Sequence, residues 1–312
     1  MAVKRIAVLY GMEDSFPPAL VNRINELGAG GIVGEHLKVG GVRMDLPSGY
    51  DVIVDRISHD IPFYRSYLKQ AALTGTEVIN NPFWWSADDK FFNYAMAAKL
   101  GVAVPPTVLL PHKSHPVGTT DRSMRNLEYP LNWDAVFEYV GFPAFLKPHD
   151  GGGWRDVYKV DNPQEVFDAY NQTGTLCMTL QRGVNFEDYY RCYVVNREKV
   201  HIMRYDPKQP HHLRYVAGNP PPDAAMAERI TKDALLLCRA LGYDLNTVEF
   251  ALEDGVPYAI DFMNPAPDAG LESVGEENFR WIVDAVAEMA IARVKSPGPA
   301  QPYEWAKMLA RG

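Results

Sequence analysis

The sequence predicts an α/β protein built from lobes that combine strands with helices, and three observations lead to this prediction. Short apolar runs alternate with helical stretches through residues 5–80, a pattern typical of a parallel sheet with helical crossovers. Further short strands, separated by turns and a few helices, follow between residues 107 and 262. The length of 312 residues allows two or three lobes, because a single domain usually spans about 100–200 residues.

We divide the chain into a Rossmann-like unit at residues 1–85, a central lobe at 86–183 and a C-terminal lobe at 184–312. Short apolar runs bounded by turn residues predict the strands, and longer stretches that end at glycine or proline predict the helices. The expected strands are residues 5–10, 51–55, 77–80, 107–110, 144–147, 157–160, 176–180, 189–195, 199–205 and 213–216, and a hairpin follows at 246–262. The expected helices are residues 21–27, 61–73, 86–100, 133–140, 163–170, 222–241 and 278–294, and residues 111–132 are expected to form a long loop.

The charge balance argues against a mainly electrostatic nucleic-acid binder. Lysine and arginine number 31 against 39 aspartate and glutamate residues, which gives a net charge of −8, whereas such a binder normally shows a basic face. No apolar run approaches the roughly 20 residues that span a bilayer, and the N-terminal residues lack the apolar core and cleavage site of a signal peptide. The three cysteines lack metal-ligand spacing, so we expect reduced thiols in a cytoplasmic protein. We expect no nucleic-acid or membrane partner, and a homodimer stays open.

The sharpest local signal is a predicted β-hairpin at residues 246–262, with Asp254-Gly255 at its turn. A register centred on Gly255 makes one face of the hairpin entirely apolar, as a packed sheet requires. On that face Val248 lies opposite Phe262, Phe250 opposite Ile260, and Leu252 opposite Tyr258. The same register places Glu249 directly opposite Asp261 on the other face.

Two carboxylates that face each other are destabilising by themselves, and a divalent cation would reverse that effect. Mg²⁺ typically takes one or two carboxylates and leaves its other positions to water and phosphate oxygens. The hairpin therefore suggests a metal site at Glu249 and Asp261, with the amide oxygen of Asn264 as a third ligand. The alternative is that this face is exposed to solvent and the two carboxylates splay apart.

Lys147 lies in an apolar strand and is soon followed by three glycines, Gly151, Gly152 and Gly153. A lysine on a mostly buried strand needs an anion or a route to solvent, and glycines let backbone N–H groups approach phosphates closely. The segment lacks the Gly-Lys-Ser/Thr sequence and the following helix of a Walker loop. A mobile flap over phosphates and a plain tight turn both stay open.

Ser86 is expected to cap a helix that carries Asp88, Asp89 and Lys90 in its first turn. A cation at that end of a helix opposes the helix dipole. The two aspartates offset this locally, and a bound phosphate would give Lys90 a function.

The segment from Gln181 to Asp188 interrupts two predicted strands. It is either a plain loop or a crossing that presents backbone groups to an adenine edge and an acid to a ribose. Arg191 and Arg204 lie on the two strands that follow. Each is either a ligand for phosphate or carboxylate, for which arginine is well suited, or a surface ion-pair partner.

Taken in order, these pieces resemble the ATP-grasp superfamily, particularly carboxylate–amine ligases such as the glutamate-adding and D-alanine–D-alanine ligases. The resemblance covers nearly the whole chain and rests on the order of the pieces. They are Asn80-Asn81-Pro82 with Asp89-Lys90, Gly101 to Thr107, Phe145 to Pro148 with Gly151–Gly153, Gln181 to Gly183, and Glu249, Asp261 and Asn264-Pro265. The resemblance implies an ATP-grasp fold with an N-terminal Rossmann-like unit and with the nucleotide between two α+β lobes. It also implies ATP and Mg²⁺, or alternatively Mn²⁺, as cofactors.

The resemblance further implies roles for individual residues. Lys90 and Lys147 look like the lysines that hold the ATP phosphates, and Gly151, Gly152 and Gly153 look like the phosphate flap. Gln181, Arg182, Gly183 and Val184 look like the adenine hinge, and either Glu187 or Asp188 looks like the ribose acid. Arg204 is similar to the arginine that steadies the transferred phosphate, and it is expected to be catalytic together with Lys147. Glu249, Asp261 and Asn264 look like the magnesium ligands.

The metal-binding segment departs from the family pattern in two ways. The usual acid-x-Asn becomes Asp261-Phe262-Met263-Asn264, so strand alternation alone would turn Asn264 away from Asp261 unless Pro265 bends the chain. The acids come as Glu then Asp instead of the commoner Asp then Glu, yet both are hard oxygen donors for the same metal.

The resemblance implies an ATP-dependent ligase that joins a carboxylate to an amine through an acyl-phosphate, with small molecules or peptides as substrates. Phosphoryl transfer needs mainly positioning and charge neutralisation, so the cysteines need no catalytic role. Two alternatives stay open. One is a kinase that phosphorylates a small molecule, and the other is a module that binds nucleotide without turnover.

Overall fold

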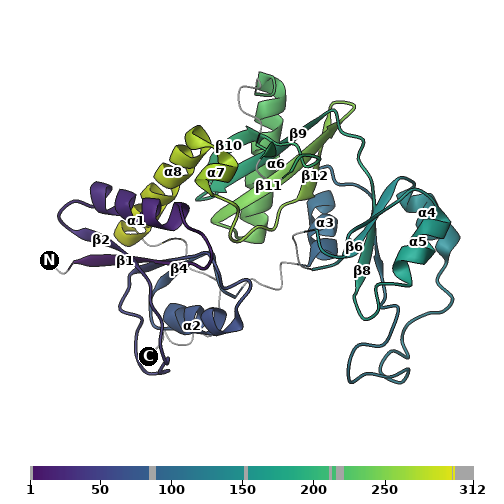
Figure 1. The fold of residues 1–312 in the computed structure, drawn as a ribbon, viewed down its shortest axis with the longest axis horizontal. Helices are drawn as coiled ribbons and strands as arrows, with labels where there is room; N and C mark the ends of the chain where they lie inside the picture. The colour runs from purple at the N-terminus through teal and green to yellow at the C-terminus, as the bar shows by residue number, and fades with distance from the viewer. Residues whose placement is uncertain are drawn as a thin grey trace. The chain divides into compact units, whose positions relative to one another are not determined.

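The computed structural model describes residues 3–83, 89–150, 154–210, 213–215, 221–296 and 298. The chain divides into two units, which Figure 1 shows as ribbons. One unit comprises Met1–Trp85, Tyr189–Glu249 and Asp261–Gly312, and the other comprises Ser86–Asp188 and Phe250–Ile260. The described residues form three four-stranded sheets, one in each of the three predicted parts. The three-part division itself stays a prediction, because most of the first and last parts share one unit.

The N-terminal residues form a parallel sheet in the order β2-β1-β3-β4, as expected for a Rossmann-like unit. Its strands are β1 (Lys4–Leu9), β2 (Ile32–His36), β3 (Val52–Asp55) and β4 (Glu77–Ile79), and its helices are α1 (Phe16–Leu27) and α2 (Pro62–Leu73). Strand β2 was not predicted from the sequence, because Gly34 interrupts its apolar pattern. Glycine is nevertheless required there, since a Cβ at position 34 would lie 2.9 Å from the Ile24 side chain of α1. Helix α1 also begins earlier than expected, with prolines in its first turn.

The central sheet is antiparallel, in the order β5-β8-β6-β7. Its strands are β5 (Thr107–Leu110), β6 (Ala144–Pro148), β7 (Tyr158–Val160) and β8 (Met178–Arg182), and the accompanying helices are α3 (Lys90–Lys99), α4 (Trp133–Val140) and α5 (Pro163–Tyr170). Leu146, Val160 and Leu180 point to one face and form a buried core with α4 and α5. Because strand residues alternate, the opposite face carries Thr107, Lys147, Thr179 and Gln181.

The third sheet has the order β10-β9-β11-β12. Its strands are β9 (Asp188–Val195), β10 (Lys199–Arg204), β11 (Leu245–Glu253) and β12 (Val256–Asp261), and its helices are α6 (Ala224–Leu241), α7 (Leu271–Val274) and α8 (Glu276–Lys295). The predicted hairpin is confirmed, since β11 and β12 are joined by Asp254 and Gly255 with φ angles of 50° and 72°. The turn does not support the expected register centred on Gly255, because that register would pair the turn residue Asp254 with Val256. The strand expected at 213–216 is wrong. In its described part, Tyr215 forms only an isolated bridge to Tyr205.

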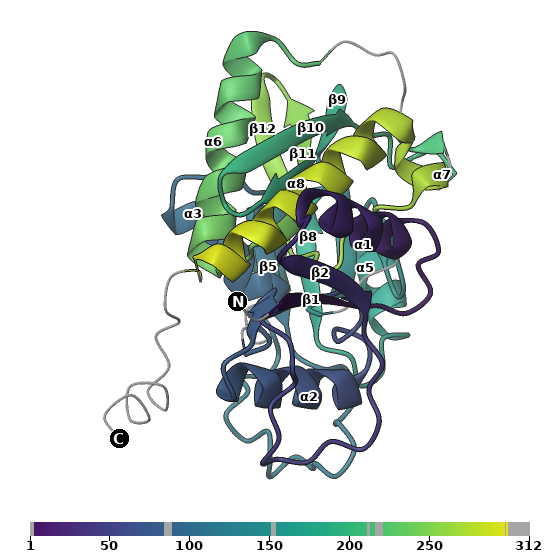
Figure 2. The ribbon, with the colours of Figure 1, turned by 90° about the vertical axis from the view of Figure 1, so that its left-hand side faces the viewer.

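Helix α8 connects the N-terminal sheet to the third sheet within their shared unit. It contacts α1, β1, β3 and β10, and Figure 2 shows it running alongside α1 and across β10. Its residues Ile282, Val286 and Ala290 are fully buried in one core with Ile6 and Val54. This shared core explains why distant parts of the chain form one unit. Among the described residues, no helix is both long and apolar enough to cross a bilayer.

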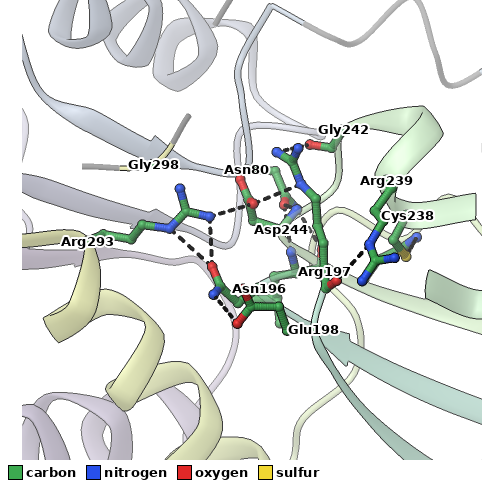
Figure 3. Close-up of polar contacts among 12 residues, drawn as sticks. Asn80, Asn196, Arg197, Glu198, Cys238, Arg239, Gly242, Asp244, Arg293 and Gly298 are labelled. Carbon is green, nitrogen blue, oxygen red and sulfur yellow. Dashed lines mark hydrogen bonds and ion pairs between the residues drawn. The ribbon is translucent and has the colours of Figure 1, made fainter. Parts of the chain in front are cut away.

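A polar network reinforces the same junction (Figure 3). Arg293 of α8 donates to Asp244 Oδ1 at 2.8 Å, to Asn196 Oδ1 at 2.7 Å and to Glu77 Oε1 at 2.8 Å. Arg197 also pairs with Asp244, with 3.0 Å between Nε and Oδ1. Arg293 and Asp244 are both buried, and buried charges of this kind need partners. The network therefore ties α8 to three segments. They are β4, the turn between β9 and β10, and the connection between α6 and β11.

Asn80, the first residue of the Asn80-Asn81-Pro82 motif, has a structural role in this junction. Its Oδ1 accepts the backbone N–H groups of Asp244 and Leu245, both at 2.8 Å. Its Nδ2 donates to the carbonyls of Leu245 and Pro265, at 2.7 and 3.1 Å. One buried amide thus fixes the start of β11 and the segment after β12 relative to β4.

Candidate active site

Two hydrogen bonds hold Lys147 on the polar face of the central sheet. Its Nζ donates to the Tyr94 hydroxyl at 2.9 Å and to Gln181 Oε1 at 2.7 Å, and it lies 5.1 Å from the centroid of the Tyr94 ring. The Tyr94 hydroxyl in turn donates to the Ile260 carbonyl at 2.5 Å. These contacts fix a half-buried cation near the end of β6, shortly before the three glycines in the sequence.

Gln181 orients the lysine through its side chain. It lies opposite Phe145 of β6 and Thr107 of β5, and only 3% of it is exposed. Its Nε2 donates to Thr107 Oγ1 at 2.8 Å, which directs its Oε1 toward Lys147. Tyr94 and Thr107 were not predicted from the sequence, because only the packing of α3 brings Tyr94 to Lys147 and only the pairing of β5 with β8 brings Thr107 to Gln181.

Helix α3 begins at Lys90, and its N-cap is Asp89, whose carboxylate accepts the N–H of Phe92 at 3.0 Å. The cap expected at Ser86 is therefore corrected, since the helix begins where an Asp oxygen satisfies one of its first amides. Ser86 and Asp88 lie outside the described residues. The Lys90 N–H donates to the His149 carbonyl at 2.8 Å. The backbone of Lys90 is thus joined to the chain two residues beyond Lys147.

The glycines expected to form a flap, Gly151, Gly152 and Gly153, lie outside the described residues. The strands that flank them, β6 and β7, pair in antiparallel fashion, as a strand–loop–strand segment requires. After the glycines, Trp154 is 60% exposed and packs edge-on against Phe145, with 6.5 Å between the ring centroids. The flap itself stays a prediction.

The residues expected to form a nucleotide hinge lie at the end of β8 and directly after it. The Gly183 N–H donates to the Pro143 carbonyl at 2.7 Å, and a Cβ at Gly183 would lie 2.9 Å from that oxygen. Glycine is therefore needed at this position because two backbone segments approach closely. Val184 and Asp188 are half-buried and Glu187 is exposed, so the choice between the two acids as the ribose ligand stays a prediction.

Arg182 anchors this segment to the β11–β12 hairpin. Its Nη1 donates to Glu253 Oε2 at 2.8 Å, and its guanidinium lies 5.0 Å from the centroid of the Tyr258 ring. Burial raises the pKa of the Glu253 carboxyl, but the hydrogen bond from Arg182 helps to outweigh burial, and the pKa lies below its usual value. Glu253 also accepts the N–H of Asn185 at 2.7 Å. The Arg182 side chain therefore joins the expected hinge segment to the β11–β12 hairpin, a contact that the sequence did not reveal.

The carboxylate of Glu249 is compensated within its own sheet. It accepts the Tyr189 hydroxyl at 2.5 Å and lies 3.5 Å from Arg191 Nε, with 15% of the Glu249 and 11% of the Arg191 side chain exposed. Burial, and then the nearby carboxylates of Glu249 and Asp261, raise the pKa of Tyr189. Both carboxylates thus act on one phenol, and the placement of Glu249 directly opposite Asp261 stays a prediction.

Asn264 lies beyond the end of β12, so strand alternation does not decide where its side chain points. Its N–H donates to Asn246 Oδ1 at 2.8 Å, and its Nδ2 donates to the Thr247 carbonyl at 3.4 Å. These contacts keep Asn264 beside β11, at Thr247, which precedes Glu249 by two residues. That Asn264 binds the metal stays a prediction.

The register of β9 and β10 separates the two candidate arginines. Arg204 lies opposite Tyr190, whereas Arg191 lies opposite Met203, so the two arginines point to opposite faces of the sheet. Arg191 Nε lies 3.4 Å from Thr247 Oγ1 and approaches Glu249, which marks its face as that of the carboxylates. Arg191, and not Arg204, therefore shares the face of Glu249, and the role expected of Arg204 stays a prediction.

Within the described ranges, no three His, Cys, Asp or Glu side chains cluster around a common point. The available donors are two carboxylates and one amide oxygen, a hard oxygen set that suits Mg²⁺ when phosphate and water oxygens complete its shell. The residues present therefore fit a magnesium ion that binds together with a nucleotide.

Comparison with known proteins gave matches only among solved structures. A scan against protein-family models found no match, and a search of curated proteins found none either. D-alanine–D-alanine ligase from Bacillus anthracis, solved with ATP, is similar over 96% of this chain and 100% of its own, with a TM-score of 0.65 and 17% identity. A RimK domain ATP-grasp protein from Sphaerobacter thermophilus is similar over 92% of this chain and 99% of its own, with a TM-score of 0.61 and 16% identity.

This chain has the ATP-grasp fold. The fold predicted from the order of the motifs is therefore confirmed. The ATP-grasp ligase PsnB, solved with a precursor peptide and AMPPNP, agrees with this result. It is similar over 94% of this chain and 98% of its own, with a TM-score of 0.60 and 14% identity. The likeness is one of fold, which spans nearly the whole chain in each case.

On the ATP-grasp fold of this chain, the candidate residues fall into two groups, one in each unit. The first group carries the cations and the hinge, and comprises Lys90, Lys147, Gln181, Arg182, Gly183 and Val184, with Glu187 and Asp188. The second carries the candidate metal ligands Glu249, Asp261 and Asn264, with Arg191 on the same face as Glu249.

Proposed function

We propose that this protein is an ATP-dependent and Mg²⁺-dependent ligase that joins a carboxylate to an amine. The placement of Lys147 on an ATP-grasp fold carries the proposal. Its ammonium group is half-buried and is held by Gln181 and Tyr94 near the end of β6. A cation fixed in this way can make charge-assisted hydrogen bonds to phosphate oxygens. The similar solved structures include ligases crystallised with ATP and with AMPPNP, which supports the use of a nucleotide.

In the proposed reaction, a carboxylate oxygen of the first substrate attacks the γ-phosphorus of ATP, and the bond to ADP breaks. The nitrogen of an amine then attacks the carbonyl carbon of the acyl-phosphate, phosphate leaves, and the amine loses a proton. Lys90 and Lys147 hold the phosphates, and the segment from Gln181 to Asp188 binds the nucleoside. Phosphoryl transfer depends on such positioning and on charge neutralisation, so no protein nucleophile is needed.

Glu249 and Asp261, together with Asn264, would hold Mg²⁺, which supplies positive charge beside the phosphate oxygens. Arg191 lies on the same face as Glu249 and within 3.5 Å of it. It is therefore better placed than Arg204 to neutralise charge on the transferred phosphoryl group. The substrates would be small molecules or peptides that carry the carboxylate and the amine.

Trapping with hydroxylamine tests the reaction type. The protein is incubated with Mg-ATP, hydroxylamine and a panel of carboxylic acids, and both ADP and hydroxamate are measured. A ligase forms an acyl-phosphate, so hydroxamate should accompany ADP. ADP with a phosphate ester and no hydroxamate would identify a kinase, and nucleotide binding without ADP release would identify a binding module.

Lys147→Ala tests the nucleotide site independently of the substrates. Charge-assisted hydrogen bonds contribute roughly 1.5–3 kcal/mol, so ATP affinity should fall about tenfold or more. Lys159→Ala is the matched control, because Lys159 lies on the neighbouring strand β7 and pairs with Asp161 at an exposed position. An unchanged ATP affinity in a folded Lys147→Ala variant would contradict the assignment.

A further inference from the structure

Asn246 is a fully buried asparagine near the start of β11. It shares a strand face with Val248 and Phe250, since residues two apart along a strand point to the same side, and all three side chains are buried. An amide among apolar side chains needs hydrogen-bond partners to offset its burial. Cys238 of α6 is only a weak acceptor, with 3.5 Å between its Sγ and Asn246 Nδ2. The strong partners therefore come from another part of the fold.

The strong partners of Asn246 belong to the segment that follows β12. Its Nδ2 donates to the Phe262 carbonyl at 2.8 Å, and its Oδ1 accepts the Asn264 N–H at 2.8 Å. One side-chain amide thus takes up the carbonyl before Met263 and the N–H after it, as the backbone of a neighbouring strand would do. Because β12 ends at Asp261, the backbone groups beyond it need such a partner.

The side chain of Asn264 is oriented by a contact of its own. Its Nδ2 donates to the Thr247 carbonyl at 3.4 Å. Because a carbonyl only accepts hydrogen bonds, this contact identifies which end of the Asn264 amide is the nitrogen. Within the described part of the chain, no hydrogen bond reaches its Oδ1. The oxygen, which is the hard donor that Mg²⁺ prefers, is therefore the end left for a ligand.

Buried side chains also hold the continuation of this segment. Asn80 Nδ2 donates to the Pro265 carbonyl at 3.1 Å. The Pro267 carbonyl accepts the Tyr193 hydroxyl at 2.7 Å and Arg56 Nη2 at 2.6 Å. These residues all belong to the same unit of the chain as Asn246. The segment after β12 is therefore fixed by side chains of its own unit.

We propose that Asn246 is a positioning residue for Asn264, and that its two hydrogen bonds adapt the longer spacing between Asp261 and Asn264 to magnesium binding. The family pattern places one residue between the acid and the asparagine, whereas this chain has two. Strand alternation would turn the two side chains apart, but the chain leaves β12 after Asp261. Contacts beyond the strand therefore decide where Asn264 lies. This inference rests on the proposed function, in which Asn264 binds the metal.

The effect of Mg²⁺ on nucleotide affinity tests the proposal. The Kd of AMPPNP is measured by calorimetry without and with Mg²⁺, and the ratio of the two values reports the coupling between metal and nucleotide. Asn246→Leu keeps the approximate size of the side chain but removes both hydrogen bonds. The ratio should fall about tenfold or more, because residues that orient a metal ligand typically change metal affinity about 10–100-fold. The Kd without Mg²⁺ should stay unchanged, which a general loss of structure would not allow.

A double-mutant cycle tests whether Asn246 acts through Asn264. Asn264→Ala should lower the ratio about as much as Asn246→Leu. The double variant should lose no more than either single variant, since both changes remove the same ligand. Asn25→Ala is the matched control. The Asn25 amide makes the same pair of hydrogen bonds, with the N–H and the carbonyl of Gly34 at 2.8 and 3.1 Å, so its loss should leave the ratio unchanged.

Hydrogen exchange of the parent protein keeps the test valid if Asn246→Leu does not fold. The Asn264 N–H is bonded to the buried Asn246 side chain. Without Mg²⁺ and nucleotide, it should therefore exchange as slowly as the backbone amides of β11, because exchange requires that the bond opens. The exchange rate of this single amide is measured by nuclear magnetic resonance.

Four results would overturn the proposal. The first is an AMPPNP affinity of the parent that does not depend on Mg²⁺. The second is an unchanged ratio in folded Asn246→Leu, or an equal fall in Asn25→Ala. The third is an unchanged ratio in Asn264→Ala, or a double variant in which the two losses add, and the fourth is rapid exchange of the Asn264 N–H. Failure of the proposed ligase function is a distinct outcome, because the ratio would then still depend on Asn246 although no hydroxamate forms.

Discussion

Replacing Glu249 by glutamine tests whether Arg191 and Tyr189 stabilise this carboxylate in the metal-free protein. Glu249 lies 3.5 Å from Arg191 Nε and accepts the Tyr189 hydroxyl at 2.5 Å, and its side chain is 15% exposed. Glutamine keeps an oxygen for Tyr189 but removes the counter-charge of Arg191. We therefore expect Glu249→Gln to destabilise the metal-free fold.

The magnitude follows from the burial of the pair. Removing one partner of a buried ion pair costs about 3–5 kcal/mol, and a hydrogen bond to a charged group contributes about 1.5–3 kcal/mol. Because glutamine retains one acceptor, the loss should lie near the lower of these ranges, at about 2–3 kcal/mol. For a unit of this size such a loss lowers Tm by about 5–10 °C.

A double-mutant cycle measures the pair directly. The free energy of unfolding is determined by denaturant titration for the parent, Glu249→Gln, Arg191→Met and the double variant. The two side chains should show a coupling of about 2 kcal/mol, because neighbours in one ion pair are not additive.

Asp261→Asn is the comparison. It removes a carboxylate that would repel Glu249, so it should melt no lower than the parent, yet it should lose most of the Tm gain on adding Mg-ATP.

The reasoning is refuted if Glu249→Gln keeps the parent Tm without ligand, or if the cycle shows a coupling below about 0.5 kcal/mol. Either result would mean that Arg191 does not compensate Glu249 in solution. A separate contradiction would be full Mg²⁺-dependent turnover in Asp261→Asn, which would exclude that carboxylate as a metal ligand.

Three further predictions concern the hinge and the α8 junction. Gly183→Ala should cost roughly 1–3 kcal/mol by calorimetry, because its Cβ would meet the Pro143 carbonyl at 2.9 Å; Gly41→Ala, where nothing lies within 4 Å, should leave Tm unchanged. Arg293→Met should cost about 3–5 kcal/mol in denaturant titration, since it removes a partner of buried Asp244, and a loss below about 1 kcal/mol would show that the network is unimportant. The pKa of Glu253 is lowered in the fold, so its contribution to stability is present above its unfolded pKa of about 4.3 and is lost as the pH falls through the folded pKa. Tm of the parent should therefore fall more steeply below about pH 4.3 than Tm of Glu253→Gln, and parallel curves would contradict this.

Several features of this protein followed from local sequence alone. Asp254-Gly255 between two alternating runs predicted the hairpin, because only a few residue types adopt positive φ at both turn positions. The strand at Thr107–Leu110 and the helices at Trp133–Val140 and Pro163–Tyr170 have the predicted bounds. The order of these elements and motifs also predicted the ATP-grasp fold. Such signals are encoded within one turn or one element and do not require knowledge of distant contacts.

Other features were decided only by the tertiary structure. The family resemblance assigned the catalytic role to Arg204, but the sequence could not show which of Arg191 and Arg204 faces Glu249, since the register of β9 and β10 decides this. Tyr94 and Thr107 gained their roles through contacts with residues 53 and 74 positions away. Strand β2 was missed because Gly34 interrupts its apolar pattern. The residue that requires a glycine there, Ile24, lies on α1 and not in the same strand. Hydrogen-bond partners and strand faces of this kind depend on pairing between distant segments, and local propensity carries no record of that pairing.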